Sequence, residues 1–186
     1  MIKSIAVYLG SSDGRGGKYL RFAYDFGAAL AARGIKVIYG GADVGTMKAL
    51  ADGVSAAGGY LTGVFPDGFG GKREVAAMNV EILRPGMTEE IIVKDFAERK
   101  AVMESLSDCA VVLPGGLGSM DELVCYSVNY EIGLHDKTVY VLNIDGYYEG
   151  LKAQIATFKR EGFLGTEDRS IVFCDSVDEL FALIFK

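Results

Sequence analysis

The stretch VVLPGGLGSMDEL, residues 111–123, combines three glycines with a serine and two adjacent carboxylates. Glycine lets backbone N–H groups approach a phosphate closely, and a helix N-terminus beyond the glycines adds about half a positive charge. Phosphate-binding loops seldom carry two acids directly behind the glycines. We therefore expect the amides of residues 115–119 to hold an anionic group. Glu122, or Asp121 in its place, would face another part of the same ligand.

A second interpretation of the same residues is purely structural. Ser119 and Glu122 fit an S-x-x-E capping box, in which the serine caps a helix and the glutamate bonds back to the serine amide. Such a cap does not need the glycines that precede it. Sequence periodicity does not choose between the two interpretations.

A buried cation is predicted on the helix expected at 96–107. Arg99 lies on the same stripe of this helix as Phe96, Met103 and Leu106. A guanidinium on an apolar stripe needs either a buried acid or an anionic ligand as its partner. A salt bridge with a structural role only is the alternative.

Short β-rich runs alternate with helical stretches along the whole chain, which predicts a parallel sheet covered on both faces. The expected strands are 5–10, 35–41, 60–65, 90–93, 109–116, 138–143 and 170–174. The expected helices are 19–33, 45–57, 96–107, 119–132, 147–160 and 176–185. We predict an α/β, Rossmann-like doubly wound sheet of about seven strands, forming a single nucleotide-binding domain over residues 1–186. The irregular segment 66–89 could be a lid or an extra surface helix.

Three of the expected strands end in glycine-rich or small-residue turns, where this architecture binds ligands. The turns are Gly10-Ser11-Ser12, Gly40-Gly41 and Gly115-Gly116-Leu117-Gly118. Taken singly, each could merely be a tight turn. No lysine followed by Ser or Thr stands at the phosphate-loop position of 40–53, and 10–17 does not fit the G-x-G-x-x-G dinucleotide fingerprint. A mononucleotide is therefore a better candidate ligand than NAD.

Composition narrows the class of protein further. The chain has 186 residues, is 50% apolar and carries a net charge of −6, which argues against a general affinity for nucleic acid or anionic membranes. It has three cysteines without a CxxC pair, and the single histidine, His135, has no partner at metal-ligand spacing. We expect a cytoplasmic protein without a membrane span, a metal or a cofactor.

At this point the sequence resembles the Lonely Guy (LOG) family, the cytokinin riboside 5′-monophosphate phosphoribohydrolases. The family signature PGGxGTxxE matches PGGLGSMDE at 114–122, with Ser119 in place of Thr, and its Glu-Arg-Lys motif matches FAERKAVM at 96–103. Further similarity lies in LGSSDG, YGGADVGTM, LGTEDR and the stretch EIGLHDKTVYVLNIDGYY at 131–148. The resemblance covers nearly the whole chain.

The resemblance implies hydrolysis of the N-glycosidic bond of AMP or an N6-substituted, cytokinin-type AMP, giving free base and ribose 5-phosphate. It implies a homodimer, and Arg99 and Glu122 as the catalytic pair. The substrate site it implies comprises Glu74, Arg99, Lys100, Gly115, Gly116, Leu117, Gly118, Ser119, Met120 and Asp121.

Two rivals remain. One is a non-catalytic nucleotide or molybdenum-cofactor carrier of the same fold. The other is the "lysine decarboxylase-like" label given to such sequences, a reaction that needs a lysine Schiff base with pyridoxal phosphate. Only Lys48 and Lys100 lie near the loops.

Overall fold

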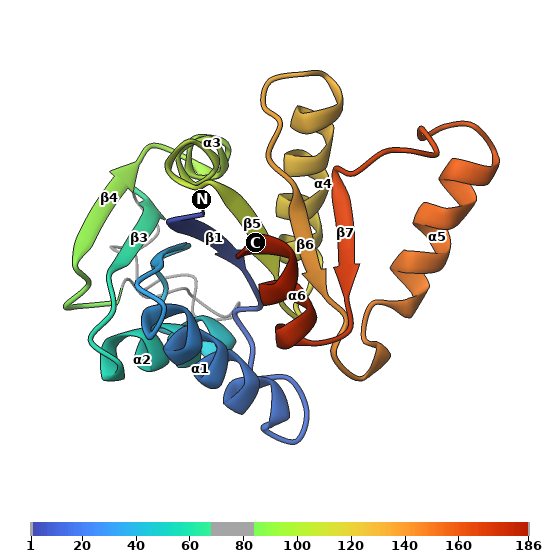
Figure 1. Ribbon diagram of the computed structural model, residues 1–186. Helices are drawn as coiled ribbons and strands as arrows, with labels where there is room; N and C mark the ends of the chain where they lie inside the picture. Colours follow the sequence, from blue (N-terminus) through green and yellow to red (C-terminus); the bar gives the residue numbers. More distant parts are fainter. Residues whose placement is uncertain (1, 68–83, 186) are drawn as a thin grey trace.

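The seven strands form one parallel sheet in the order β4-β3-β2-β1-β5-β6-β7 (Figure 1). The computed structural model describes residues 2–67 and 84–185. The strands are β1 (Ser4–Tyr8), β2 (Lys36–Tyr39), β3 (Leu61–Pro66), β4 (Glu89–Val93), β5 (Cys109–Val112), β6 (Val139–Leu142) and β7 (Ile171–Cys174). The predicted fold class is confirmed. Most of the segment 66–89 lies outside the described residues.

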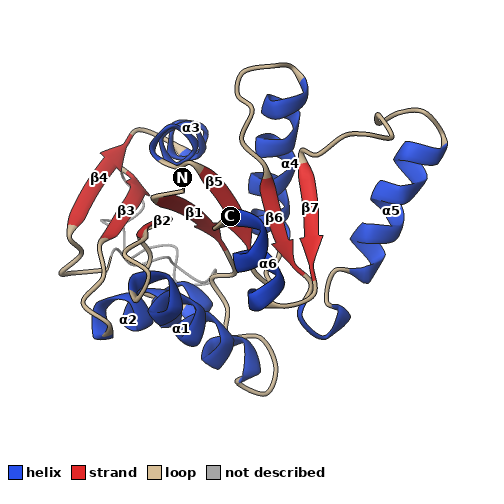
Figure 2. Cartoon of the chain, viewed as in Figure 1, coloured by secondary structure: helices blue, strands red, loops and turns tan. Residues whose placement is uncertain are grey.

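Helices cover both faces of the sheet, as Figure 2 shows. They are α1 (Lys18–Ala31), α2 (Gly45–Ala56), α3 (Phe96–Leu106), α4 (Leu117–Glu131), α5 (Glu149–Arg160) and α6 (Val177–Ile184), with a short 3-10 turn at Ile144–Gly146. Helices α1, α2 and α6 pack against one face, and α3 and α4 pack against the other. Asp95 caps α3 by accepting a 2.8 Å hydrogen bond from the Glu98 N–H.

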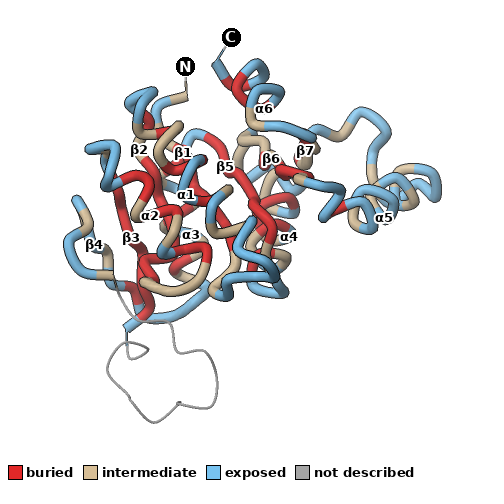
Figure 3. The backbone as a smooth tube through the Cα atoms, turned by 90° about the horizontal axis from the view of Figure 1, so that it is seen from below, coloured by how far each residue is buried: buried red, intermediate tan, exposed pale blue. Residues whose placement is uncertain are grey.

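The central strands are buried along almost their whole length because helices lie on both sides of them (Figure 3). Helix α5 differs from the other helices, since none of its residues is buried. It stands beside α4 at the margin of the molecule, and Figure 3 shows it mostly exposed. Glycine brings α1 and α2 close together: a Cβ on Gly27 would stand 2.3 Å from the Leu50 carbonyl oxygen.

The chain reverses its direction of winding between β1 and β5. Strand β1 pairs with β2 on one side and with β5 on the other, Ile5 opposite Val37 and opposite Cys109. The loops that follow β1 and β5 therefore leave in opposite directions and open a crevice at the carboxyl ends of these strands. In open α/β sheets this switch point is where ligands bind.

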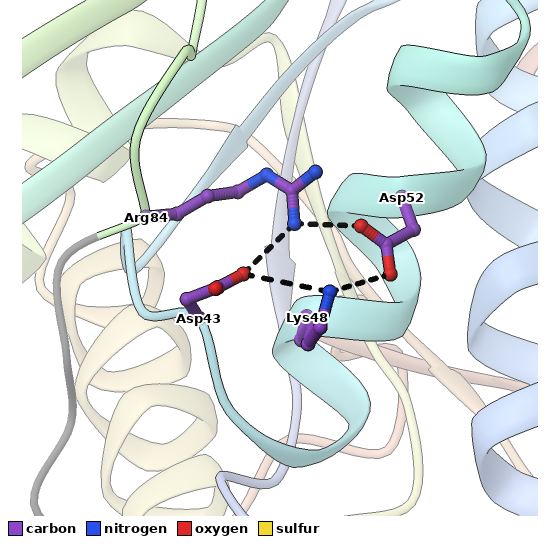
Figure 4. Close-up of polar contacts among 4 residues, drawn as sticks. All are labelled: Asp43, Lys48, Asp52 and Arg84. Atoms are coloured by element: carbon purple, nitrogen blue, oxygen red, sulfur yellow. Dashed lines mark hydrogen bonds and ion pairs between the residues drawn. The ribbon is translucent and has the colours of Figure 1, made fainter.

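Beside this edge of the sheet, four charged side chains join α2 to the chain ahead of β4 (Figure 4). Arg84 contacts Asp43 at 2.9 Å and Asp52 at 2.7 Å. Lys48 contacts Asp52 at 2.9 Å, and the Arg84 N–H donates to the Gly41 carbonyl at 2.8 Å. Burial acts to raise the pKa of Asp52, but its bonds to Lys48 and Arg84 outweigh burial, so the pKa lies below its ordinary value.

We expect Asp52→Asn to lower the melting temperature at pH 7, and the gap to wild type to close on acidification. A depressed folded-state pKa gives stability that is fully present above the unfolded pKa of about 3.9 and is lost as pH falls through the folded value. The wild type therefore begins to lose this contribution below about pH 4, whereas the variant never has it. Thermal melts at pH 7 and pH 3 test this, with the exposed Asp25→Asn as a neutral control. A gap that persists unchanged at pH 3 would contradict it.

Candidate active site

A pocket of about 610 Å³ opens at the switch point between β1 and β5. The loop after β1 forms one wall, and the glycine loop with the start of α4 forms another. The start of α3 closes a third side with Phe96, Arg99 and Lys100. The remaining lining comes from single side chains, namely Tyr19 of α1, Thr46 of α2 and Tyr147 after β6.

The glycine loop ends as the N-terminus of α4, and this corrects two expectations. The helix begins at Leu117 rather than at 119, and its N-cap is Gly116, which makes no side-chain cap bond. The first helical bond runs from the Met120 N–H to the Gly116 carbonyl at 3.1 Å. Ser119 therefore lies inside the first turn and is not the N-cap, so the capping-box interpretation is wrong. The N–H groups ahead of Met120 lack an intrahelical acceptor and are free to bind an anion.

Ser119 lies under the glycine loop. Its side chain is buried, and its Oγ has no hydrogen-bond partner among residues 2–67 and 84–185. A Cβ on Gly115 would stand 2.1 Å from this Oγ and 3.0 Å from the Gly10 nitrogen, so only glycine allows the two loops to come together here. A buried hydroxyl without a partner is costly, and an anion bound at the loop would satisfy it.

The Arg99 and Glu122 side chains face each other inside the pocket. Arg99 Nη2 lies 3.7 Å from Glu122 Oε1, and the two side chains are only 6% and 12% exposed. Arg99 reaches this place because Gly40 has no side chain: a Cβ there would stand 1.6 Å from Arg99 Nη2. A buried cation and a mostly buried anion are thus held side by side next to the amides at the start of α4.

A second ion pair stands at the outer edge of the pocket. Lys100 Nζ contacts Asp121 Oδ2 at 2.7 Å, and the Asp121 side chain is 64% exposed. The hydrogen bond to Asp121 raises the pKa of Lys100 above its ordinary value. The Asp121 carboxylate therefore forms an ion pair with Lys100 and is exposed to solvent. This favours Glu122 as the carboxylate that faces the ligand.

Most of the predicted site residues are brought together here. The pocket is lined by Gly10, Ser11, Arg99, Lys100, Gly115, Gly116, Leu117, Gly118, Ser119, Asp121 and Glu122. Three others are placed elsewhere. Gly40 lies behind Arg99, Gly41 packs against Phe65, and Met120 packs into the core beneath α4. Glu74 lies outside the described residues.

Ser12 was expected in a ligand-binding turn, but sequence reasoning missed several other pocket residues, chiefly Arg15, Tyr19, Thr46, Phe96 and Tyr147. Phe96 was expected on the apolar stripe of α3 and is instead 41% exposed at the pocket. Thr46 lines the pocket because its Oγ1 donates to the Gly10 carbonyl at 2.6 Å. For Tyr147 the sequence offers one signal, its place beyond the carboxyl end of a strand, where ligands bind in this architecture, but it does not show the contact of its hydroxyl.

Two negative findings concern residues 2–67 and 84–185. No three His, Cys, Asp or Glu side chains gather closely enough there to hold a metal ion. None of the helices in those ranges is both long and apolar enough to cross a membrane.

A parallel sheet with a pocket at its switch point defines the molecule as a Rossmann-like α/β protein, and comparisons with known proteins narrow this class. The family model described as "possible lysine decarboxylase" matches residues 47–184. A cytokinin riboside 5′-monophosphate phosphoribohydrolase from Rhodococcoides fascians is 36% identical over 183 residues, covering 98% of this chain and 89% of the relative. The homologous enzyme LOG5 from Arabidopsis thaliana is 36% identical over 91% of this chain and 71% of its own length. The chain belongs to this Lonely Guy family of phosphoribohydrolases.

Solved structures show the same fold at lower identity. The molybdenum cofactor binding protein from Rippkaea orientalis has a TM-score of 0.68 at 21% identity, covering 100% of this chain and 96% of that one. The Moco carrier protein from Chlamydomonas reinhardtii has a TM-score of 0.69 at 18% identity, with coverage of 100% and 96%.

Proposed function

We propose that this protein is an enzyme that hydrolyses the N-glycosidic bond of a nucleoside 5′-monophosphate, AMP or an N6-substituted AMP, to free base and ribose 5-phosphate. The observation that carries the proposal is the Arg99–Glu122 pair, 3.7 Å apart and mostly shielded from solvent, in a pocket walled by the start of α4. Its relatives' names support the same activity. The amides suit the 5′-phosphate, and the carboxylate suits the sugar.

The chemistry follows from charge. Departure of the base leaves positive charge on the ribose in an oxocarbenium-like transition state. The Glu122 carboxylate stabilises this charge and orients the attacking water. Arg99 holds the carboxylate in place and balances its buried charge. Fixed groups of this kind contribute several kcal/mol in a site that excludes water, because they need no reorganisation during the reaction.

We expect the enzyme to release base from AMP or an N6-substituted AMP and to act poorly on adenosine. The 5′-phosphate of a nucleotide can use the amides of 116–119 together with the Ser119 hydroxyl, whereas adenosine carries no anionic group for them. A panel of nucleoside monophosphates and matching nucleosides, with released base measured, tests this. Equal rates on nucleotide and nucleoside would contradict the proposal.

A non-catalytic carrier is the rival function. The cofactor-binding neighbours share the fold, but at 18–21% identity they indicate nothing about the ligand. A carrier has no use for a buried carboxylate beside the proposed sugar position, whereas a hydrolase does. Tight nucleotide binding without release of base would favour the carrier.

The decarboxylase label is poorly supported by the two lysines near the loops. A Schiff-base lysine must lose its proton, yet the bond to Asp121 raises the pKa of Lys100. The Lys48 ammonium pairs with Asp52 at 2.9 Å within the four-charge cluster of Figure 4, and Lys48 does not line the pocket.

We also propose a cytoplasmic homodimer that assembles through α4 and α5. Between these helices runs an apolar groove of about 510 Å³ lined by Val124, Val128, Ile155, Phe158 and Phe163, and the Phe163 side chain is 85% exposed. Exposed apolar patches of this kind mark interfaces, and α5 has no buried residue of its own. A second copy of the chain would supply the missing cover. The three free thiols fit a reducing compartment.

Light scattering at micromolar concentration is expected to give twice the chain mass of 19.9 kDa. Val128→Asp should give a monomer, because it places a charge in the apolar groove. Leu183→Asp on α6 is the matched control, since Leu183 is also partly exposed but lies on the opposite side of the sheet. A wild-type monomer would overturn the dimer.

A further inference from the structure

Two consecutive tyrosines after β6, Tyr147 and Tyr148, donate hydrogen bonds to carbonyl groups at the start of the glycine loop. The Tyr147 hydroxyl donates to the Gly115 carbonyl at 2.7 Å, and the Tyr148 hydroxyl donates to the Leu113 carbonyl at 2.8 Å. The two carbonyls stand on either side of Pro114. The start of the loop is thus fixed by side chains from a different part of the chain.

The two tyrosines differ in their surroundings. Tyr148 is buried, and its hydroxyl serves a carbonyl of the core. Tyr147 is 44% exposed and lines the pocket, with its ring held edge-on by Tyr19 at 5.5 Å and by Tyr148 at 4.8 Å. The turn that carries it is tied to α1 by the 2.8 Å ion pair of Lys18 with Asp145. Tyr147 is therefore ordered by packing as well as by its hydrogen bond.

Holding the Gly115 carbonyl fixes the amide that follows. The peptide between Gly115 and Gly116 is planar and trans, so its C=O and N–H point in opposite directions. Gly116 is the N-cap of α4, and its amide leads the row of N–H groups without an intrahelical acceptor. Glycine at both positions gives this peptide more rotational freedom than other residues would. One hydrogen bond to the carbonyl removes much of that freedom.

We propose that Tyr147 is a positioning residue of the active site: its hydroxyl orients the Gly115–Gly116 peptide so that the loop amides are ready for the 5′-phosphate. This rests on the proposed function of the same pocket. Tyr147 acts through the loop, and its contribution belongs to phosphate binding rather than to the departure of the base. Tyr148 has a structural role, because its hydroxyl donates to the Leu113 carbonyl in the core.

The test compares Tyr147→Phe with Tyr148→Phe and with Tyr24→Phe, an exposed tyrosine on α1 outside the pocket. The phenylalanine keeps each ring and removes only the hydroxyl. For Tyr147→Phe we expect KM for AMP and the inhibition constant of ribose 5-phosphate to rise together by roughly 3- to 10-fold, the equivalent of one hydrogen bond. The kcat for AMP and the residual rate on adenosine should stay within about twofold, and the melting temperature within about 2 °C.

Tyr148→Phe should mainly lower stability. We expect its melting temperature to fall by several degrees, because the variant leaves the buried Leu113 carbonyl without its hydrogen-bond donor. Tyr24→Phe should change neither the KM for AMP nor the melting temperature. Unchanged KM and inhibition constant in Tyr147→Phe, with wild-type hydrolysis intact, would overturn the positioning role and leave the proposed function standing.

Calorimetric titration with AMP distinguishes a failure of the proposed function from a failure of the positioning role of Tyr147. If the wild type binds AMP but hydrolyses no nucleotide, the proposed function fails, and a dissociation constant raised 3- to 10-fold in Tyr147→Phe still supports the positioning role. If the wild type binds neither AMP nor ribose 5-phosphate, both proposals fall.

Discussion

Replacing Glu122 by glutamine is expected to lower kcat for AMP by about 10²-fold or more while leaving AMP affinity nearly unchanged. Glutamine keeps the shape of the side chain but loses the negative charge that meets the developing oxocarbenium. This interaction is stronger in the transition state than in the ground state, so its loss falls on kcat rather than on binding. Steady-state kinetics of base release together with calorimetric AMP titration measure the two quantities.

Asp121→Asn is the matched control for this variant. Asp121 neighbours Glu122 in sequence, but its carboxylate pairs with Lys100 at 2.7 Å and is mostly exposed. Its substitution should cost far less in kcat. Glu122→Gln also removes the negative charge that lies 3.7 Å from the buried Arg99 guanidinium, so a melting temperature lower by a few degrees is expected. Near wild-type turnover in Glu122→Gln, or a larger loss in Asp121→Asn, would remove Glu122 from the catalytic role.

The second large effect is expected from Gly40→Ala, a substitution at a position that does not itself line the pocket. The new Cβ would stand 1.6 Å from Arg99 Nη2 and 2.5 Å from Arg99 Cζ. Because the arginine end is flexible and the β2 backbone is not, the guanidinium should move away from Glu122 while the sheet stays intact. We expect kcat to fall by about 10-fold or more, as in Arg99→Ala, with weaker nucleotide binding if Arg99 also contacts the nucleotide.

A double-mutant cycle tests the mechanism of this effect. If Gly40→Ala acts by displacing Arg99, adding it to Arg99→Ala should cost almost nothing further. Gly150→Ala in α5 is the control, since a Cβ there meets open space. Additive losses would mean that Gly40 acts by another route, and wild-type kinetics in Gly40→Ala would mean that the position of Arg99 is unimportant.

The sheet was predictable because its signal is local. Strands that are apolar throughout and alternate with helices allow few arrangements other than a doubly wound parallel sheet. The glycine loop and Arg99 could be singled out, since glycines after a strand and a cation on an apolar stripe each point to an anionic ligand, although a structural explanation stayed open for both. The pairing of Arg99 with Glu122 came from the family resemblance. The start of α4 could not be fixed, because Gly116 and Ser119 are both acceptable N-caps and only the tertiary contact of Gly115 with Gly10 decides between them.

What the sequence concealed were contacts between distant segments. Gly40 reads as one more turn glycine until Arg99 is seen to occupy the space its side chain would need. Tyr147 reads as an apolar residue after a strand, and only the folded chain shows its hydroxyl at the Gly115 carbonyl. Both contacts depend on which loops meet at the edge of the sheet. Strand order decides which loops meet, and no short stretch of sequence encodes strand order.

The place of β1 in the middle of the sheet has a consequence for biosynthesis. Within this chain β1 is made early, and its β2 side can be paired soon afterwards, yet Ile5 must wait for Cys109 before its other edge is closed. Until then the nascent chain exposes an apolar strand edge of the kind that promotes aggregation, and long-range pairing of this sort slows folding. The pocket opens between these same two strands, so the ability to bind ligand should arrive late and in one step, as the second half of the chain docks onto the first.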